Sequence, residues 1–264
     1  MRRQRLPRTA VRDRVQARDD NDSTPPAADV TLRRGFADVW RRLDDATLHR
    51  PYRITCWRIL HTCLGCNAYL SHVRRDAATP PYCTAPACAA GEALETLTHA
   101  FIDCPAARPA TEWLCETWRR LSGSDTPRSA RLLLADDPDG WDGAAAPGAL
   151  QLWTRLRVAT LGAIWQVRCT RDLDPRSLAH RAVKLAIDSV VGAIKRDWAR
   201  TRSDIRRLDE GDFTRDWWSS TDAGLSLRRF RAAWTSPALL CDVDAAGQLQ
   251  LFLSRDGPVP VPPP

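Results

Sequence analysis

The chain has 264 residues, enough to bury one well-formed core or two small ones. Its composition, 44% hydrophobic and 27% charged, is typical of a globular protein, and no stretch approaches the roughly 20 apolar residues that would cross a bilayer. The formal net charge of +7 favours a polyanionic partner, and nearly all of the basic residues are arginines. No apolar segment follows the N-terminal arginines, so we expect an intracellular protein, in the nucleus or cytoplasm, rather than a secreted one.

Residues 1–30 form a basic arm with hardly any large apolar side chains, and we expect it to be disordered. Its arginines are candidates for contacts with nucleic-acid phosphates: Arg2, Arg3, Arg5, Arg8, Arg12 and Arg14. A solvated leader, or a boundary made by a chance start codon, is an equal alternative. A mitochondrial presequence is a third reading, disfavoured by Asp13.

Helical periodicity begins with a short segment over residues 36–43. Pro51 suits the first position of a second helix, which Gly65 should end, and apolar residues then repeat at helical spacing at Ile54, Trp57, Leu60 and Leu64. Another turn or two should begin at residues 67–74. Cys63 and Cys66 border this apolar helix, so we interpret both as core residues rather than as a metal pair.

The next stretch, residues 81–105, carries the strongest chemical signal. It contains Cys83, Cys88, His99 and Cys104 in the spacing C-x4-C-x10-H-x4-C. Three thiolates and one imidazole complete a tetrahedral Zn²⁺ site and leave no position for a substrate. The alternative is four ordinary buried residues, but their clustering between proline-bounded loops favours one structural zinc ion.

The run ETLTHAFIDCP over residues 95–105, after paired cysteines, resembles the reverse-transcriptase zinc-binding domain. That domain lies near the C-terminus of many polyproteins of retrotransposons lacking long terminal repeats. The similarity extends upstream to Val39-Trp40, Tyr52-Arg53, Trp57–His61 and Leu64, and downstream to Trp113 and Trp118. The family usually separates its first two cysteines by two residues, where this chain has four. The resemblance implies that the zinc segment helps to hold template RNA or target DNA beside a polymerase.

Beyond the metal segment, an apolar stripe from Trp113 to Leu121 predicts a helix that Gly123 closes. Asp136 and Asp137 stand in a turn composition, and we interpret them as an acidic loop rather than as metal ligands of a polymerase. Two long helices should follow, and we expect them to pack as an antiparallel pair. The first runs over about 150–168, with Leu152, Leu156, Ala159, Ala163 and Val167 in register. The second is capped at Asp174 and carries its stripe from Ala179 to Trp198.

The C-terminal part should contain a polar loop over residues 209–222, a short helix over 227–234 and a β-hairpin. The hairpin turn is expected at Gly247, between alternating apolar residues at 239–243 and 249–253.

Together these patterns predict a mainly α protein, with a small zinc-stapled helical module followed by a helical pair and a C-terminal hairpin. The expected divisions are a disordered arm (1–30), the zinc-binding module (31–134), a linker (135–148), a helical region with the hairpin (149–257) and a disordered proline-rich tail (258–264).

The expected function is that of a non-catalytic accessory domain that binds RNA or DNA without sequence preference, with no membrane and no small-molecule substrate. The alternative is a zinc-stabilised protein-interaction module. No phosphate-binding loop, catalytic triad or carboxylate cluster is recognisable, so we expect no enzymatic activity.

Overall fold

The computed structural model describes residues 42–73, 80–89, 91–123, 128, 148–170, 178–209, 219–234 and 240–253. Several sequence predictions lie outside these residues. They are the basic arm, most of the helix over 36–43, the acidic loop at Asp136 and Asp137, the cap at Asp174 and the proline-rich tail.

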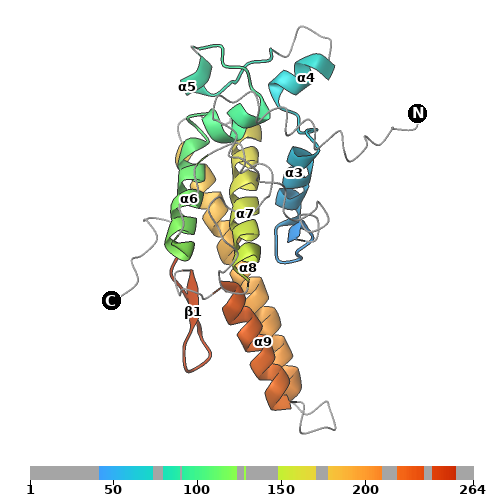
Figure 1. The fold of residues 1–264 in the computed structure, drawn as a ribbon, viewed down its shortest axis with the longest axis vertical. Coiled ribbons are helices and arrows are strands. Elements are labelled where there is room, and N and C mark those ends of the chain that lie inside the picture. The colour runs from blue at the N-terminus through green and yellow to red at the C-terminus, as the bar shows by residue number, and fades with distance from the viewer. Residues whose placement is uncertain are drawn as a thin grey trace, which may run out of the picture.

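The described chain is mainly helical with a two-stranded hairpin near its C-terminus, which confirms the predicted fold class (Figure 1). The elements follow one another as α3 (Arg50–Leu60), α4 (Asn67–Val73), α5 (Pro86–Ala89), the π-helical turn η1 (His99–Asp103), α6 (Arg108–Ser122), α7 (Ala149–Cys169), α8 (Leu178–Asp209), α9 (Ser219–Trp234), β1 (Cys241–Val243) and β2 (Leu249–Leu251).

Helix α7 lies at the centre of the molecule, in contact with α3, α6, α8 and α9. The stripe predicted for it is buried, and so are residues off that stripe, including Trp153, Val158 and Leu161. A helix surrounded by others has little exposed surface to fill with polar residues. This explains why α7 is buried on more sides than a member of a simple helical pair. Helix α8 runs antiparallel beside it, as predicted (Figure 1).

Helix α3 approaches α7 closely where Tyr52 faces Gly162. A Cβ atom on Gly162 would lie 2.1 Å from Cγ of Tyr52, so only glycine allows this contact. The Tyr52 hydroxyl donates a hydrogen bond to Oε1 of Gln166 at 2.7 Å. Burial, with the nearby charge of Asp188, raises the pKa of Tyr52 to about 12, which keeps the phenol protonated as a donor.

The helix at α3 is confirmed, but the apolar repeat that predicted it does not mark its buried face. The side chains that face the core are Tyr52, Thr55, Cys56, Ile59 and Leu60. Ile54 and Trp57, two of the four repeating positions, are exposed. A second correction concerns Cys63, which is exposed, whereas Cys66 is buried as expected. Cys63 lies just past the end of α3, beyond the residues that pack against α7.

The segment before α3 is tied to α7 by a buried ion pair. Nε of Arg155 donates to Oδ2 of Asp45 at 2.9 Å, and Gln151 donates to the same oxygen at 2.6 Å. The backbone N–H and hydroxyl of Thr47 both donate to Oδ1. Burial by itself raises the pKa of Asp45, but Arg155 and Thr47 outweigh it and hold the pKa below its ordinary value.

The C-terminal helices are longer than predicted. Helix α8 continues to Asp209, and α9 begins at Ser219, so the predicted polar loop is partly helical. The two helices meet through the rings of Trp198 and Phe230, 5.0 Å apart, and Nε1 of Trp234 donates to Asp197 at 2.8 Å. These contacts join residues more than thirty positions apart and leave no local signal in the sequence.

The hairpin is confirmed. Its strands are antiparallel, with Cys241 opposite Leu251 and Val243 opposite Leu249. Gly247 lies in the turn with φ of 71°, a left-handed conformation that favours glycine. Buried side chains from both sides of the predicted linker form one continuous core, which includes Leu60, Phe101 and Leu156.

Candidate metal centre

The segment that holds the four predicted ligands, called here the metal loop (residues 80–105), is closed at its base by a short antiparallel bridge. Tyr82 pairs with Leu94. The backbone N–H of Cys83 donates to the carbonyl of Ala93 at 2.7 Å, and that of Glu95 donates to Pro81 at 2.9 Å. This bridge fixes the position of Cys83 and directs the chain after it into a compact turn.

The four residues between Cys83 and Cys88 form that turn. The N–H of Ala85 points back to Sγ of Cys83 at 3.5 Å, and the N–H of Cys88 donates to the carbonyl of Ala85 at 2.8 Å. Pro86 then begins the single helical turn of α5, which carries Cys88. Four residues separate the two cysteines, two more than in a C-x2-C pair. The helical turn of α5 accommodates them, so both sulfur atoms still reach one point.

The second pair of ligands is brought together by the π-helical turn η1. The N–H of Cys104 donates to the carbonyl of His99 at 2.8 Å, a bond that spans five residues. In an ordinary α-helix, residues five apart point about 140° away from each other. The wider turn instead places His99 and Cys104 on one side, and such turns often occur at functional sites.

The four side chains meet in a compact cluster. Their potential ligand atoms all lie within 4.8 Å of one another. Sγ of Cys104 lies 3.9 Å from Sγ of Cys83 and 3.8 Å from Sγ of Cys88. A tetrahedral zinc ion with Zn–S bonds of about 2.3 Å separates its sulfur ligands by about 3.8 Å. The spacing of the thiols therefore matches a metal-centred tetrahedron, whereas a disulfide requires about 2 Å.

His99 supplies independent support for a ligand role. Its Nε2 atom is buried and has no hydrogen-bond partner among the described residues. A buried polar atom of this kind costs free energy unless something satisfies it. A cation between His99 and the three thiols would do so.

The neighbouring thiols oppose the ionisation of Cys104. The hydrogen bond with the Cys83 thiol, together with burial and the neighbouring sulfurs, raises the pKa of Cys104 above its ordinary value. Three thiolates at this separation repel one another and resist ionisation. A bound divalent cation reverses this balance, because it stabilises all three in the ionised form.

The metal loop is anchored to the core by Glu95, whose side chain is fully buried. Its carboxylate forms an ion pair with Arg168 near the end of α7 and accepts a hydrogen bond from the backbone N–H of Asn67 at 2.9 Å. Arg168 also donates to the side-chain oxygen of Asn67 at 2.7 Å. Burial alone lowers the pKa of Arg168, but its contacts with Glu95 outweigh burial and raise it. This network fixes the metal loop against both α4 and α7.

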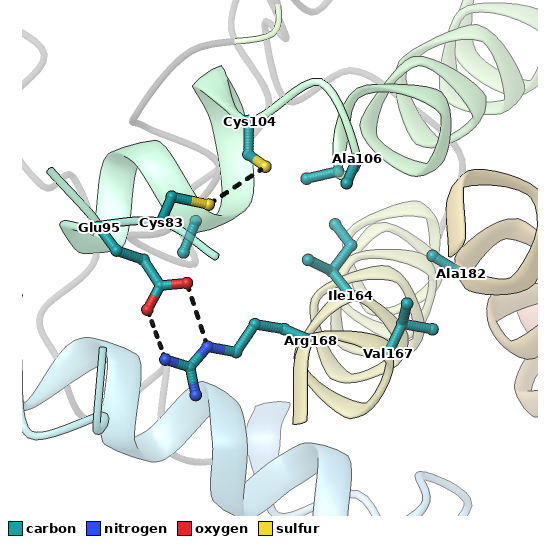
Figure 2. Close-up of a pocket in the computed structure, with 10 residues that line it drawn as sticks. Cys83, Glu95, Cys104, Ala106, Ile164, Val167, Arg168 and Ala182 are labelled. Carbon is teal, nitrogen blue, oxygen red and sulfur yellow. Dashed lines mark hydrogen bonds and ion pairs between the residues drawn. The ribbon is translucent and has the colours of Figure 1, made fainter. Parts of the chain in front are cut away.

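Figure 2 shows that the anchor lines one cavity together with two of the predicted ligands, Cys83 and Cys104. The sulfurs of Cys83 and Cys104 face each other on one side, and the Glu95–Arg168 ion pair closes another. The remaining wall is apolar, from Ile164 and the small side chains around it, and the space holds about one water molecule. The sequence alone gives no role to Glu95. Glu92, three residues earlier, is also a glutamate, so the sequence does not single out Glu95 as the buried one.

The structure brings all four predicted ligands together and leaves the other cysteine candidates apart. Cys63 and Cys66 do not belong to the cluster. The arginines predicted to contact nucleic acid, Arg2, Arg3, Arg5, Arg8, Arg12 and Arg14, lie outside the described residues. The metal loop itself contains no lysine or arginine.

Comparisons with protein-family models, curated proteins and solved structures found no match to this chain. Among the described helices, none is both long and apolar enough to span a membrane.

Proposed function

We propose that the chain is a non-catalytic, zinc-stabilised domain that binds nucleic acid and derives from the polyprotein of a retrotransposon lacking long terminal repeats. The observation that carries this proposal is the cluster of three thiols and one unsatisfied imidazole at tetrahedral spacing. The resemblance of residues 95–105 to the reverse-transcriptase zinc-binding domain supplies the family context.

Zinc is the metal that this ligand set favours, since thiolates and imidazole are soft or borderline donors and the geometry is tetrahedral. The role is structural because four protein ligands leave no open coordination position for water or substrate. Glu95, the buried carboxylate beside the ligands, is held by Arg168 and Asn67 and is not free to act as a base.

Positive charge on the described helices supports a polyanionic partner, although it does not surround the metal loop. Exposed cationic side chains lie on α8 and α9, at Lys195, Arg196, Arg200, Arg202, Arg228, Arg229 and Arg231. Asp197 and Asp204 are the only carboxylates with described side chains in the same parts of these helices. Nucleic acid would therefore contact α8 and α9, and the metal loop would stabilise the fold without contacting the nucleic acid.

Salt dependence of binding tests this proposal. Fluorescence anisotropy with a labelled single-stranded oligonucleotide should show binding that weakens steeply between about 50 mM and 200 mM salt, because neutralised phosphates release counterions. The absence of binding at low salt, or affinity that does not change with salt, would contradict a nucleic-acid role.

One observation favours the alternative of a protein-interaction module. Tyr82 and Leu94, paired across the bridge of the metal loop, are 38% and 54% exposed. They form an uncharged apolar pair of the kind that proteins bury on association. Zinc retention without any oligonucleotide binding is the result that this alternative predicts.

A further inference from the structure

The outer face of α3 combines exposed apolar side chains with arginines. We define this α3 outer face by Arg50, Arg53, Ile54, Trp57, Arg58 and His61. At 100° per residue, these positions lie within about 140° of arc, opposite the residues that pack on α7. Ile54 is 42% and Trp57 47% exposed, although they are one turn apart on a helix whose other side is well buried.

The indole of Trp57 is held in place. The ring of His61, one turn later, lies 4.1 Å from it between centroids at an interplanar angle of 37°. Trp57 is therefore supported by a neighbour on its own face of the helix and still keeps nearly half of its side chain in solvent. An ordered, exposed aromatic ring of this kind offers a stacking surface.

The charges around Trp57 are all positive along the helix. No aspartate or glutamate occurs within α3. Arg53 donates to Asp44 at 3.2 Å, while Arg50 and Arg58 are exposed and form no ion pair within the described part of the chain. Arg50 and Arg58 lie about 12 Å apart along the axis, so they can contact different phosphates of one strand.

We propose that the α3 outer face binds single-stranded nucleic acid, with an unpaired base stacked on Trp57 and the flanking phosphates held by Arg50 and Arg58. This inference rests on the proposed nucleic-acid function and adds a contact surface on α3 to the cationic residues of α8 and α9. Proteins that bind single strands combine a basic surface with aromatic rings that stack on bases. A protein partner would have to supply carboxylates to match the arginines, whereas a single strand brings both negative charge and exposed π faces.

The test compares three single-residue variants of the full chain with the unmodified protein. The probe is a labelled oligothymidylate of about 16 nucleotides, the upper site size for one such platform. Stacking of one base contributes about 5- to 150-fold in affinity, so Trp57→Ala should weaken binding by about 5-fold or more. Trp57→Phe keeps an aromatic face and should retain most of the affinity. Tyr82→Ala removes an aromatic ring of similar exposure on the metal loop and should change the affinity by less than about 2-fold.

An abasic strand of the same length separates stacking from charge. The unmodified protein should prefer oligothymidylate to the abasic strand, and Trp57→Ala should abolish that preference. Equal binding of oligothymidylate by the unmodified protein and Trp57→Ala would overturn the inference and leave the nucleic-acid function in place. That result is also the one expected if the face docks a protein. If the unmodified protein binds neither strand at low salt, the proposed function fails, and this inference fails with it.

Discussion

Replacing Glu95 by glutamine should destabilise the protein far more than the loss of one surface charge. The carboxylate is fully buried and satisfies both the Arg168 guanidinium and the backbone N–H of Asn67. Glutamine keeps the shape but removes the charge and turns an amide NH2 or a weaker acceptor towards Arg168. Breaking a buried ion pair by removing one partner costs about 3–5 kcal/mol. The Arg168 side chain is 19% exposed, and water can partly solvate it, so we expect about 3 kcal/mol, at the lower end of this range.

The assay is urea unfolding of zinc-loaded protein, followed by circular dichroism, with the free energy of unfolding taken from the midpoint at unchanged m-value. Glu116→Gln is the matched control. Glu116 accepts hydrogen bonds from Arg119 at 2.8 Å and from Arg120 at 2.6 Å, but it is 40% exposed. An exposed pair contributes about 1 kcal/mol or less. A loss in Glu95→Gln no larger than that in Glu116→Gln would show that burial does not decide the strength of this anchor.

Two further predictions concern the contacts of α7. Gly162→Ala should lower the free energy of unfolding by about 1–3 kcal/mol or more, because the new Cβ would overlap Cγ of Tyr52 at 2.1 Å. Gly192→Ala on α8, where the nearest atom is the mobile end of Arg196 at 3.1 Å, is the control and should be neutral or stabilising by up to about 1 kcal/mol in the same urea assay. The lowered pKa of Asp45 means that its ion pair with Arg155 contributes stability above the ordinary carboxyl pKa of 3.8, and that this contribution is lost as pH falls below it. The difference in unfolding midpoint between the unmodified protein and Asp45→Asn should therefore be largest near neutral pH and shrink towards about pH 3; a difference that stays constant over this range would contradict it.

The features that the sequence predicted well depend on neighbours close in the chain. The metal ligands lie on one short segment, and their spacing was sufficient to group all four. Helix α7 and the hairpin followed from local periodicity and from a glycine at the turn.

The features that escaped prediction depend on contacts between distant residues. Glu95 and Arg168 are 73 positions apart, and Asp45 and Arg155 are 110 apart. Neither pair leaves a pattern that a scan of neighbouring residues detects. The apolar repeat of α3 does not reveal its inward face for the same reason, since Gly162 of α7 decides that Tyr52, rather than Trp57, points inwards.

Metal content measured by mass spectrometry tests whether Cys83, Cys88, His99 and Cys104 hold one structural zinc ion. The purified protein and the exposed-cysteine control Cys63→Ser should each carry one zinc per chain, and Cys66→Ser should do the same. Cys83→Ser and His99→Ala should lose the metal, because each removes one of four ligands whose combined binding contributes about 10–16 kcal/mol in zinc-finger peptides. Zinc that persists in Cys83→Ser but disappears from Cys63→Ser would contradict the assignment.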